Sequence, residues 1–139
     1  MLRSGLLIIA SLALACSGLR LNGRTHNLLD GRWIPIRQEL GGRELPSATY
    51  AGYLLTIKDS VYTYTDHDRG VLSYTGGHMD IYGRAGVNAG KHFTAIYKLD
   101  KDTLVVCYNL AGTAYPTAFD TKAGPRLFLS AYKREAAGP

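Results

Sequence analysis

The sequence predicts an all-β domain, a single antiparallel up-and-down β-barrel of about eight strands. Three observations lead to this fold class. From residue 30 onward, apolar and polar residues alternate with a period of two, as in strands that bury one face. Turn-forming residues interrupt the alternation at short intervals. Beyond the N-terminal segment 1–15, no stretch keeps a 3.6-residue apolar period, so amphipathic helices are not expected.

Eight segments share the alternating pattern and end at turn residues: 32–39, 50–58, 61–65, 71–74, 78–82, 93–99, 103–108 and 127–133. Pro35 has no backbone N–H to donate, so the first strand is expected to lie at an edge or to bend there. Asp59-Ser60, Gly76-Gly77 and Asp100-Lys101-Asp102 are typical of hairpin turns. Because the hairpins follow one another without a long crossing, the pattern favours an up-and-down barrel over a Greek key.

The first 15 residues read as a signal peptide. Arg3 supplies a positive charge, and an apolar run over 5–15 follows that is too short to span a bilayer as a helix. Ala13-Leu14-Ala15 then has the small-x-small pattern of a cleavage site. We therefore expect an exported protein.

Residues 12–16, Leu-Ala-Leu-Ala-Cys, resemble the lipobox of bacterial lipoproteins, although Ala13 stands where leucine is usual. The resemblance implies that Cys16 is lipidated and holds the chain at a membrane of the cell envelope. Residues 16–28 would then form a tether before a barrel domain over 29–135. The alternative is ordinary cleavage and secretion, which leaves Cys16 unmodified.

Composition and charge narrow the range of partners. Hydrophobic residues make up 46% of the chain, which argues against intrinsic disorder. The net charge is +5, but the Lys and Arg residues are scattered and form no cluster interleaved with aromatic residues. A nucleic-acid partner is therefore not expected. The ten tyrosines suit half-buried strands and pocket walls, because a tyrosine has an apolar ring and a polar tip.

Several stretches resemble a lipocalin-like family of small exported proteins that is abundant in planctomycete bacteria and has no established activity. The matching stretches are Gly31-Arg32-Trp33, the block 95–109 (AIYKLDKDTLVVCYN), 116–119 and 127–134. Together they cover about residues 28–134. This family usually has arginine before its Pro-Thr pair, where this chain has Tyr115. The resemblance implies the barrel fold but no activity.

The expected function is to bind a small apolar or amphipathic ligand inside the barrel, without catalysis and without a cofactor. Alternation suggests Trp33, Tyr97, Val106 and Tyr108 as ligand-binding residues, with tyrosine hydroxyls orienting the ligand. Trp33 could instead plug the barrel floor, and the tyrosines could fill the core. The alternative function is an envelope-associated structural or protein-interaction domain with a packed barrel.

A third alternative is an enzyme built on the barrel. His78 and Asp80 are two residues apart in a predicted strand and share one face, and His92 could join them. Met79 and Ile81 on the other face resemble core residues, which directs His78 and Asp80 outward. No metal-ligand spacing or nucleophile motif accompanies them, so we expect no metal site and no catalytic residues. Cys107 is expected to be a small buried apolar residue.

Overall fold

The structure is a computed structural model that describes residues 27–65 and 67–136. The predicted signal peptide (1–15), Cys16 and most of the predicted tether lie outside the described residues. Within the described part of the chain, no helix is long and apolar enough to cross a membrane.

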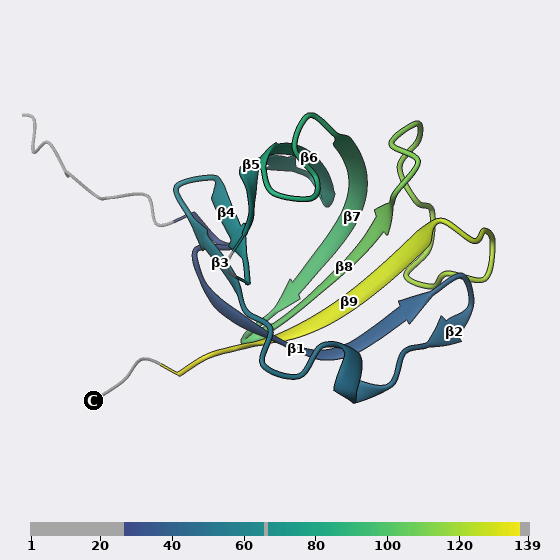
Figure 1. Ribbon diagram of the computed structural model, residues 1–139, viewed down its shortest axis with the longest axis horizontal. Coiled ribbons are helices and arrows are strands. Elements are labelled where there is room, and N and C mark those ends of the chain that lie inside the picture. The colour runs from purple at the N-terminus through teal and green to yellow at the C-terminus, as the bar shows by residue number, and fades with distance from the viewer. Residues whose placement is uncertain (1–26, 66, 137–139) are drawn as a thin grey trace, which may run out of the picture.

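The described residues form a closed antiparallel β-barrel with almost no helix (Figure 1). The strands are β1 (Gly31–Leu40), β2 (Arg43–Glu44), β3 (Leu55–Lys58), β4 (Val61–Tyr64), β5 (Asp68–Thr75), β6 (His78–Ala85), β7 (His92–Asp100), β8 (Thr103–Asn109) and β9 (Leu127–Arg134), with a 3-10 turn, η1 (Ser47–Thr49). The sheet runs β1-β3-β4-β5-β6-β7-β8-β9, and β9 pairs back with β1. The short β2 pairs only with the end of β1. The predicted eight-stranded up-and-down barrel is confirmed, and each predicted strand segment overlaps a strand of the barrel.

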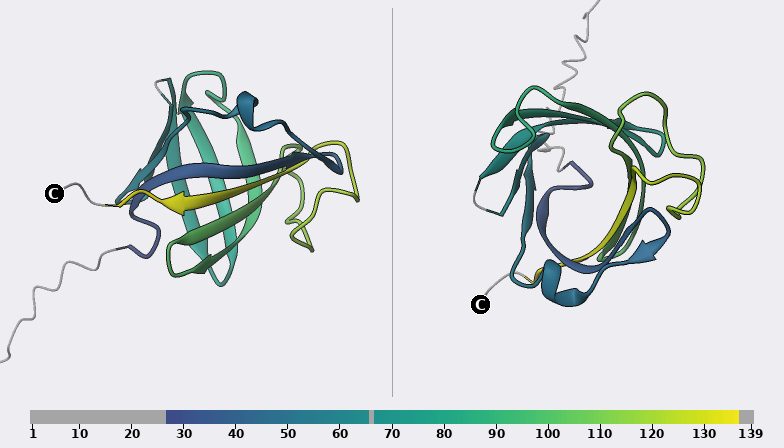
Figure 2. Two further views of the ribbon diagram at one scale, coloured as in Figure 1. Left: turned by 90° about the horizontal axis from the view of Figure 1, so that it is seen from below. Right: turned by 45° about the vertical axis from the view of Figure 1, so that its right-hand side comes forward.

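The two ends of the barrel differ in their connections (Figure 2). At one end, which we call the closed end, the turns are short. Asp59 and Ser60 have φ of 49° and 65°, and Gly76 and Gly77 have φ of 58° and 83°. Positive φ at both central residues matches the right-handed twist of the flanking strands, so these predicted hairpins are confirmed. The other end, the mouth, carries the longer segments 41–54, 86–91 and 110–126.

Trp33 plugs the closed end. Its side chain is fully buried, and its Nε1 donates a hydrogen bond to the carbonyl oxygen of Leu29 at 2.9 Å. The Arg134 guanidinium lies 4.2 Å from the centre of the indole ring and donates to the carbonyl oxygen of Asp30 at 2.6 Å. Gly31 has φ of 151°, and a Cβ there would collide with this guanidinium, so only glycine fits before the tryptophan.

A β-bulge in β1 reverses which residues face the interior. The pairing of β1 with β9 shifts register between Pro35 and Arg37, which confirms the bend predicted at Pro35. Trp33 before the bulge and Gln38 after it are both buried, although their numbers have opposite parity. The bulge therefore brings a polar side chain into the barrel from a strand that carries the Trp33 plug.

The segment 110–126 packs outside the wall and forms a partial second layer over β8 and β9 (Figure 2). The Thr121 backbone N–H and hydroxyl both donate to Glu39, at 3.1 and 2.6 Å. Cys107 and Leu129 lie buried beneath this layer, and the Cys107 Sγ is 3.6 Å from the carbonyl oxygen of Asp120. Burial raises the pKa of the Cys107 thiol to about 11, so it is a buried apolar group, as predicted.

We expect Trp33→Ala to lower the free energy of unfolding by about 3–5 kcal/mol, because it leaves a large void under the barrel core. Ile34→Ala is the matched control, because Ile34 is the next residue of the same strand and is 42% exposed. This substitution should lower the free energy of unfolding by about 0.5 kcal/mol. Urea unfolding followed by circular dichroism measures both. Equal losses in the two variants would contradict the assignment of Trp33 as the plug.

Candidate ligand-binding cavity

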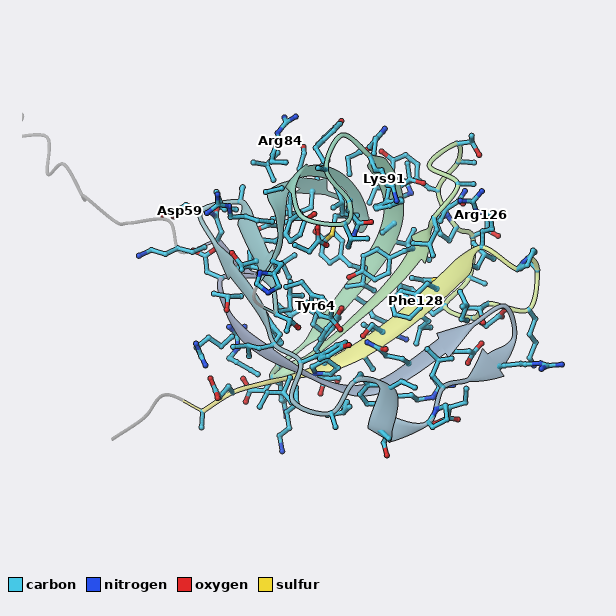
Figure 3. All side chains as sticks on the ribbon, viewed as in Figure 1. Asp59, Tyr64, Arg84, Lys91, Arg126 and Phe128 are labelled. Carbon is cyan, nitrogen blue, oxygen red and sulfur yellow. The ribbon has the colours of Figure 1, made fainter. Side chains whose placement is uncertain are left out.

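A cavity of about 300 Å³ occupies the barrel between the Trp33 plug and the mouth. Figure 3 shows Tyr64 and Phe128 reaching into the space between opposite walls of the barrel. The residues that line it come from β1 and from β3 to β9, together with the segments next to the mouth: Gln38, Tyr53, Leu55, Ile57, Tyr62, Tyr64, Asp68, Leu72, Met79, Ile81, Asn88, Phe93, Leu104, Val106, Tyr108, Leu110, Phe128 and Tyr132.

The deep part of the cavity is apolar. Leu55 and Ile57 of β3 alternate with residues on the outer face, as do Met79 and Ile81 of β6. Leu104 and Val106 continue the same surface from β8 and are almost fully buried. Aliphatic side chains of this kind offer a ligand dispersion contacts and no hydrogen bonds, so this part suits an apolar group.

A polar strip runs along one wall of the cavity. The Gln38 amide Nε2 donates to the Tyr64 hydroxyl and to the Ser130 hydroxyl, each at 3.3 Å. The hydroxyls of Tyr108 and Tyr132 lie 3.2 Å apart and share a hydrogen bond. Polar groups buried in an apolar wall need such partners, and those that also face the cavity can orient a ligand.

Burial keeps these phenols neutral. It raises the pKa of Tyr62 and of Tyr64 to about 12, and it raises the pKa of Tyr108 and Tyr132 above the usual value as well. A neutral phenol can both donate and accept a hydrogen bond. The cavity therefore presents hydroxyl groups, and not phenolates, across the physiological pH range.

One carboxyl group lines the cavity near the mouth. Asp68 is the first residue of β5, and its Oδ2 accepts a hydrogen bond from the Asn88 side-chain amide at 2.7 Å. Asn88 belongs to the β6–β7 connection, which folds back over Gly83. A Cβ at Gly83 would overlap the Asn88 carbonyl oxygen, so glycine is required for this close approach.

The four residues suggested from alternation all face the interior, at different depths. Val106 and Tyr108 line the cavity. Trp33 lies below it as the plug, and Tyr97 packs edge-on against Tyr74, with ring centres 5.6 Å apart. Tyr97 pairs with Val106 in the sheet, so the alternation is right even though Tyr97 is not among the lining residues. Trp33 and Tyr97 therefore build the packed lower part of the barrel.

Sequence reasoning missed the polar lining residues. Gln38 reaches the interior only because of the bulge at Pro35–Arg37, and the sequence shows no position for a bulge beyond the proline itself. Asp68 lies between the predicted strand segments 61–65 and 71–74, whereas β5 begins at Asp68 and Asp68 pairs with Tyr64. Aspartate is rare in strands, so the pattern gave no signal for it.

His78 and Asp80 lie on the outer face, with Met79 and Ile81 inside, as predicted, and His92 of β7 lies on the outer face as well. They belong to one surface cluster: His92 Nε2 is 2.7 Å from Asp80 Oδ1, Asp80 also accepts a hydrogen bond from the Tyr115 hydroxyl, and Tyr115 stacks on His78. These hydrogen bonds hold the pKa of Asp80 below its usual value, and the bond from Tyr115 has the largest effect. The cluster ties segment 110–126 to the wall and lies outside the cavity. Among the described residues, no group of three or more His, Cys, Asp or Glu side chains is arranged so that it could hold a metal ion.

Comparison of the chain with protein-family models, with curated proteins and with solved structures gave no match.

The raised pKa values predict that Tyr62 and Tyr64 are among the tyrosines that ionise late. Below about pH 10, where a tyrosine of the unfolded chain is neutral, their contribution to stability is complete; it is lost as the pH rises from about 10 toward 12. Absorbance titration of tyrosinate should show a step near pH 12 that shrinks in Tyr62→Phe and in Tyr64→Phe. The unfolded chain in urea, where all tyrosines should ionise near pH 10, is the control. An unchanged high-pH step in both variants would contradict this assignment.

Proposed function

We propose that this protein is an exported, lipid-anchored, lipocalin-like binding module that holds one small apolar or amphipathic ligand inside its barrel. The observation that carries the proposal is the cavity of about 300 Å³, closed below by Trp33 and reached from the mouth. An eight-stranded barrel has room either for packed side chains or for one small ligand. The cavity volume lies at the lower end of the range of small-molecule sites.

The lining supports an amphipathic ligand. Its deep wall is aliphatic, whereas the hydroxyls of Tyr64 and Tyr108, the Gln38 amide and the Asp68 carboxyl lie on other parts of it. An apolar wall with a few convergent polar groups is the usual make-up of a ligand pocket. A structural domain with a packed barrel, the alternative, has no need for this volume.

A non-catalytic function is supported by the place of Asp80 and His92, the pair considered for an enzyme. Asp80 and His92 bond to each other on the outer face, separated from the cavity by the wall of β6. A substrate in the cavity would not reach them. Export and lipidation of Cys16 are part of the proposal on the strength of the sequence features in 1–16.

The test of binding is native mass spectrometry of the purified full chain after incubation with lipid and metabolite extracts of the cells that produce it. We expect a defined added mass that disappears in Val106→Trp, because the indole occupies the cavity. Val106→Phe fills less of the cavity. It should weaken binding by about tenfold or more, because burying two fewer methylene groups of the ligand costs about 1.5 kcal/mol.

The matched control is Val61→Trp. Val61 is 44% exposed on the outside of β4, so this variant should bind as the unmodified chain does. Circular dichroism and thermal unfolding verify that each variant is folded. An unmodified chain that stays free of added mass in all extracts would contradict the proposal and favour a protein-interaction domain.

A further inference from the structure

The Asp68 carboxyl is incompletely bonded. Its Oδ2 accepts one hydrogen bond from Asn88, whereas its Oδ1 is shielded from solvent and has no hydrogen-bond partner among the described residues. Only one other side-chain oxygen in the described ranges shares this condition, the Thr65 hydroxyl. Both residues flank the β4–β5 turn at the mouth, so the unsatisfied oxygens of the barrel concentrate at one place.

An unsatisfied buried acceptor is costly. Leaving a buried polar group without a partner costs about 1–3 kcal/mol, and more when the group is charged. The ion pairs of the described residues do not include Asp68, so no cation of the described protein offsets its charge. A cation that enters the cavity beside Asp68 would supply the countercharge that the described residues do not supply.

The surroundings of Asp68 suit a cation. Tyr64 is its direct partner across the strands, and Tyr62 lies two pairs further along, over Gly70, where a Cβ would meet the tyrosine ring. Burial is the main cause of the raised pKa of Tyr62, and the charge of Asp68 is the second cause. The two groups are therefore within electrostatic reach of each other. Aromatic faces attract cations, so the rings and the carboxylate favour the same kind of group.

Other charged groups do not compete inside the cavity. Among the described residues, the lining contains no Lys, Arg or His, and Asp68 is its one carboxylate. Arg84, Lys91 and Arg126 are exposed, and Figure 3 shows them at the periphery of the barrel. These residues give the outer surface a positive charge, but they leave a ligand inside the cavity next to a negative one.

We propose that the ligand is a small primary amine, whose ammonium group pairs with the Asp68 carboxylate while its apolar body fills the aliphatic part of the cavity. This inference rests on the proposed function, because it specifies the polar end of the ligand of the same cavity. The volume sets the size: at about 30 Å³ for each water-sized group, 300 Å³ holds about ten non-hydrogen atoms. A fatty acid is excluded as the preferred ligand, since its carboxylate would face Asp68.

The test compares octylammonium, 1-octanol and octanoate, which share one apolar chain and differ in the charge of the polar end. Isothermal titration calorimetry of the full chain at neutral pH, where a primary amine is protonated, measures all three. We expect octylammonium to bind at least about tenfold more tightly than octanol, because a hydrogen bond between two charged groups is worth about 1.5–3 kcal/mol. Octanoate should bind most weakly.

Asp68→Asn tests the residue itself. It removes the charge and keeps the shape, and the new amide oxygen can still accept from Asn88. We expect this variant to lose the preference for octylammonium and to bind octanol as before. Asp59→Asn is the matched control with the same change in net charge: Asp59 lies in the β3–β4 turn, at the end of β4 opposite to the one that pairs with Asp68, and its variant should keep the preference.

The outcomes separate this inference from the proposed function. If octanol or octanoate binds as tightly as octylammonium and Val106→Trp abolishes that binding, the cavity binds ligands but the amine assignment is wrong. Equal loss of octylammonium binding in the Asp68 and Asp59 variants would also overturn it, because a general charge effect would then explain the preference. If none of the three binds and cell extracts add no mass, both proposals fail.

Discussion

Closure of the sheet through the pairing of β9 with β1 is the constraint on which the rest of the structure depends. Eight strands enclose an interior that is too narrow for a water-filled channel and wide enough for one small ligand. The same closure leaves no long free sheet edge in the described barrel, which removes a common route to aggregation. What the protein can bind is then decided by how much of that interior its side chains fill.

The interior is filled from one end only. At the closed end, Trp33 and the Arg134 guanidinium stack across the barrel, and Leu29 covers them with a carbonyl oxygen that accepts the indole N–H. Tight turns allow this end to be packed, because no connecting segment has to cross it. Toward the mouth the lining changes to side chains that project into space, such as Phe128 and Tyr64, and the packed core gives way to a cavity.

Period-two patterning and turn chemistry were sufficient to predict the strands and their order, and they place Val106 and Tyr108 on one face of their strand without showing that this face is the inner one. Both signals are local. In an up-and-down barrel, strands that follow one another in the sequence are also neighbours in the sheet, so the local signals also predict the strand order. How deep a side chain lies within the barrel is not determined by the local sequence. Tyr97 and Tyr108 have the same pattern in the sequence, yet one packs below the cavity and the other lines it. The bulge that turns Gln38 inward depends on the pairing of β1 with β9, which no single segment encodes.

The two carboxyl groups of Glu39 and Asp68, both near the mouth, show how Asp68 differs from a structural acid. Glu39 lies outside the wall, where the Thr121 backbone N–H, the Thr121 hydroxyl and the Arg37 guanidinium all donate to it. These hydrogen bonds hold the pKa of Glu39 below its usual value, and the bond from the Thr121 hydroxyl has the largest effect. Asp68 receives one bond, from a neutral amide. The described residues therefore surround a carboxylate with donors where it fixes a loop, and give a carboxylate one neutral donor where it lines the cavity, which is the arrangement expected when a ligand supplies the countercharge.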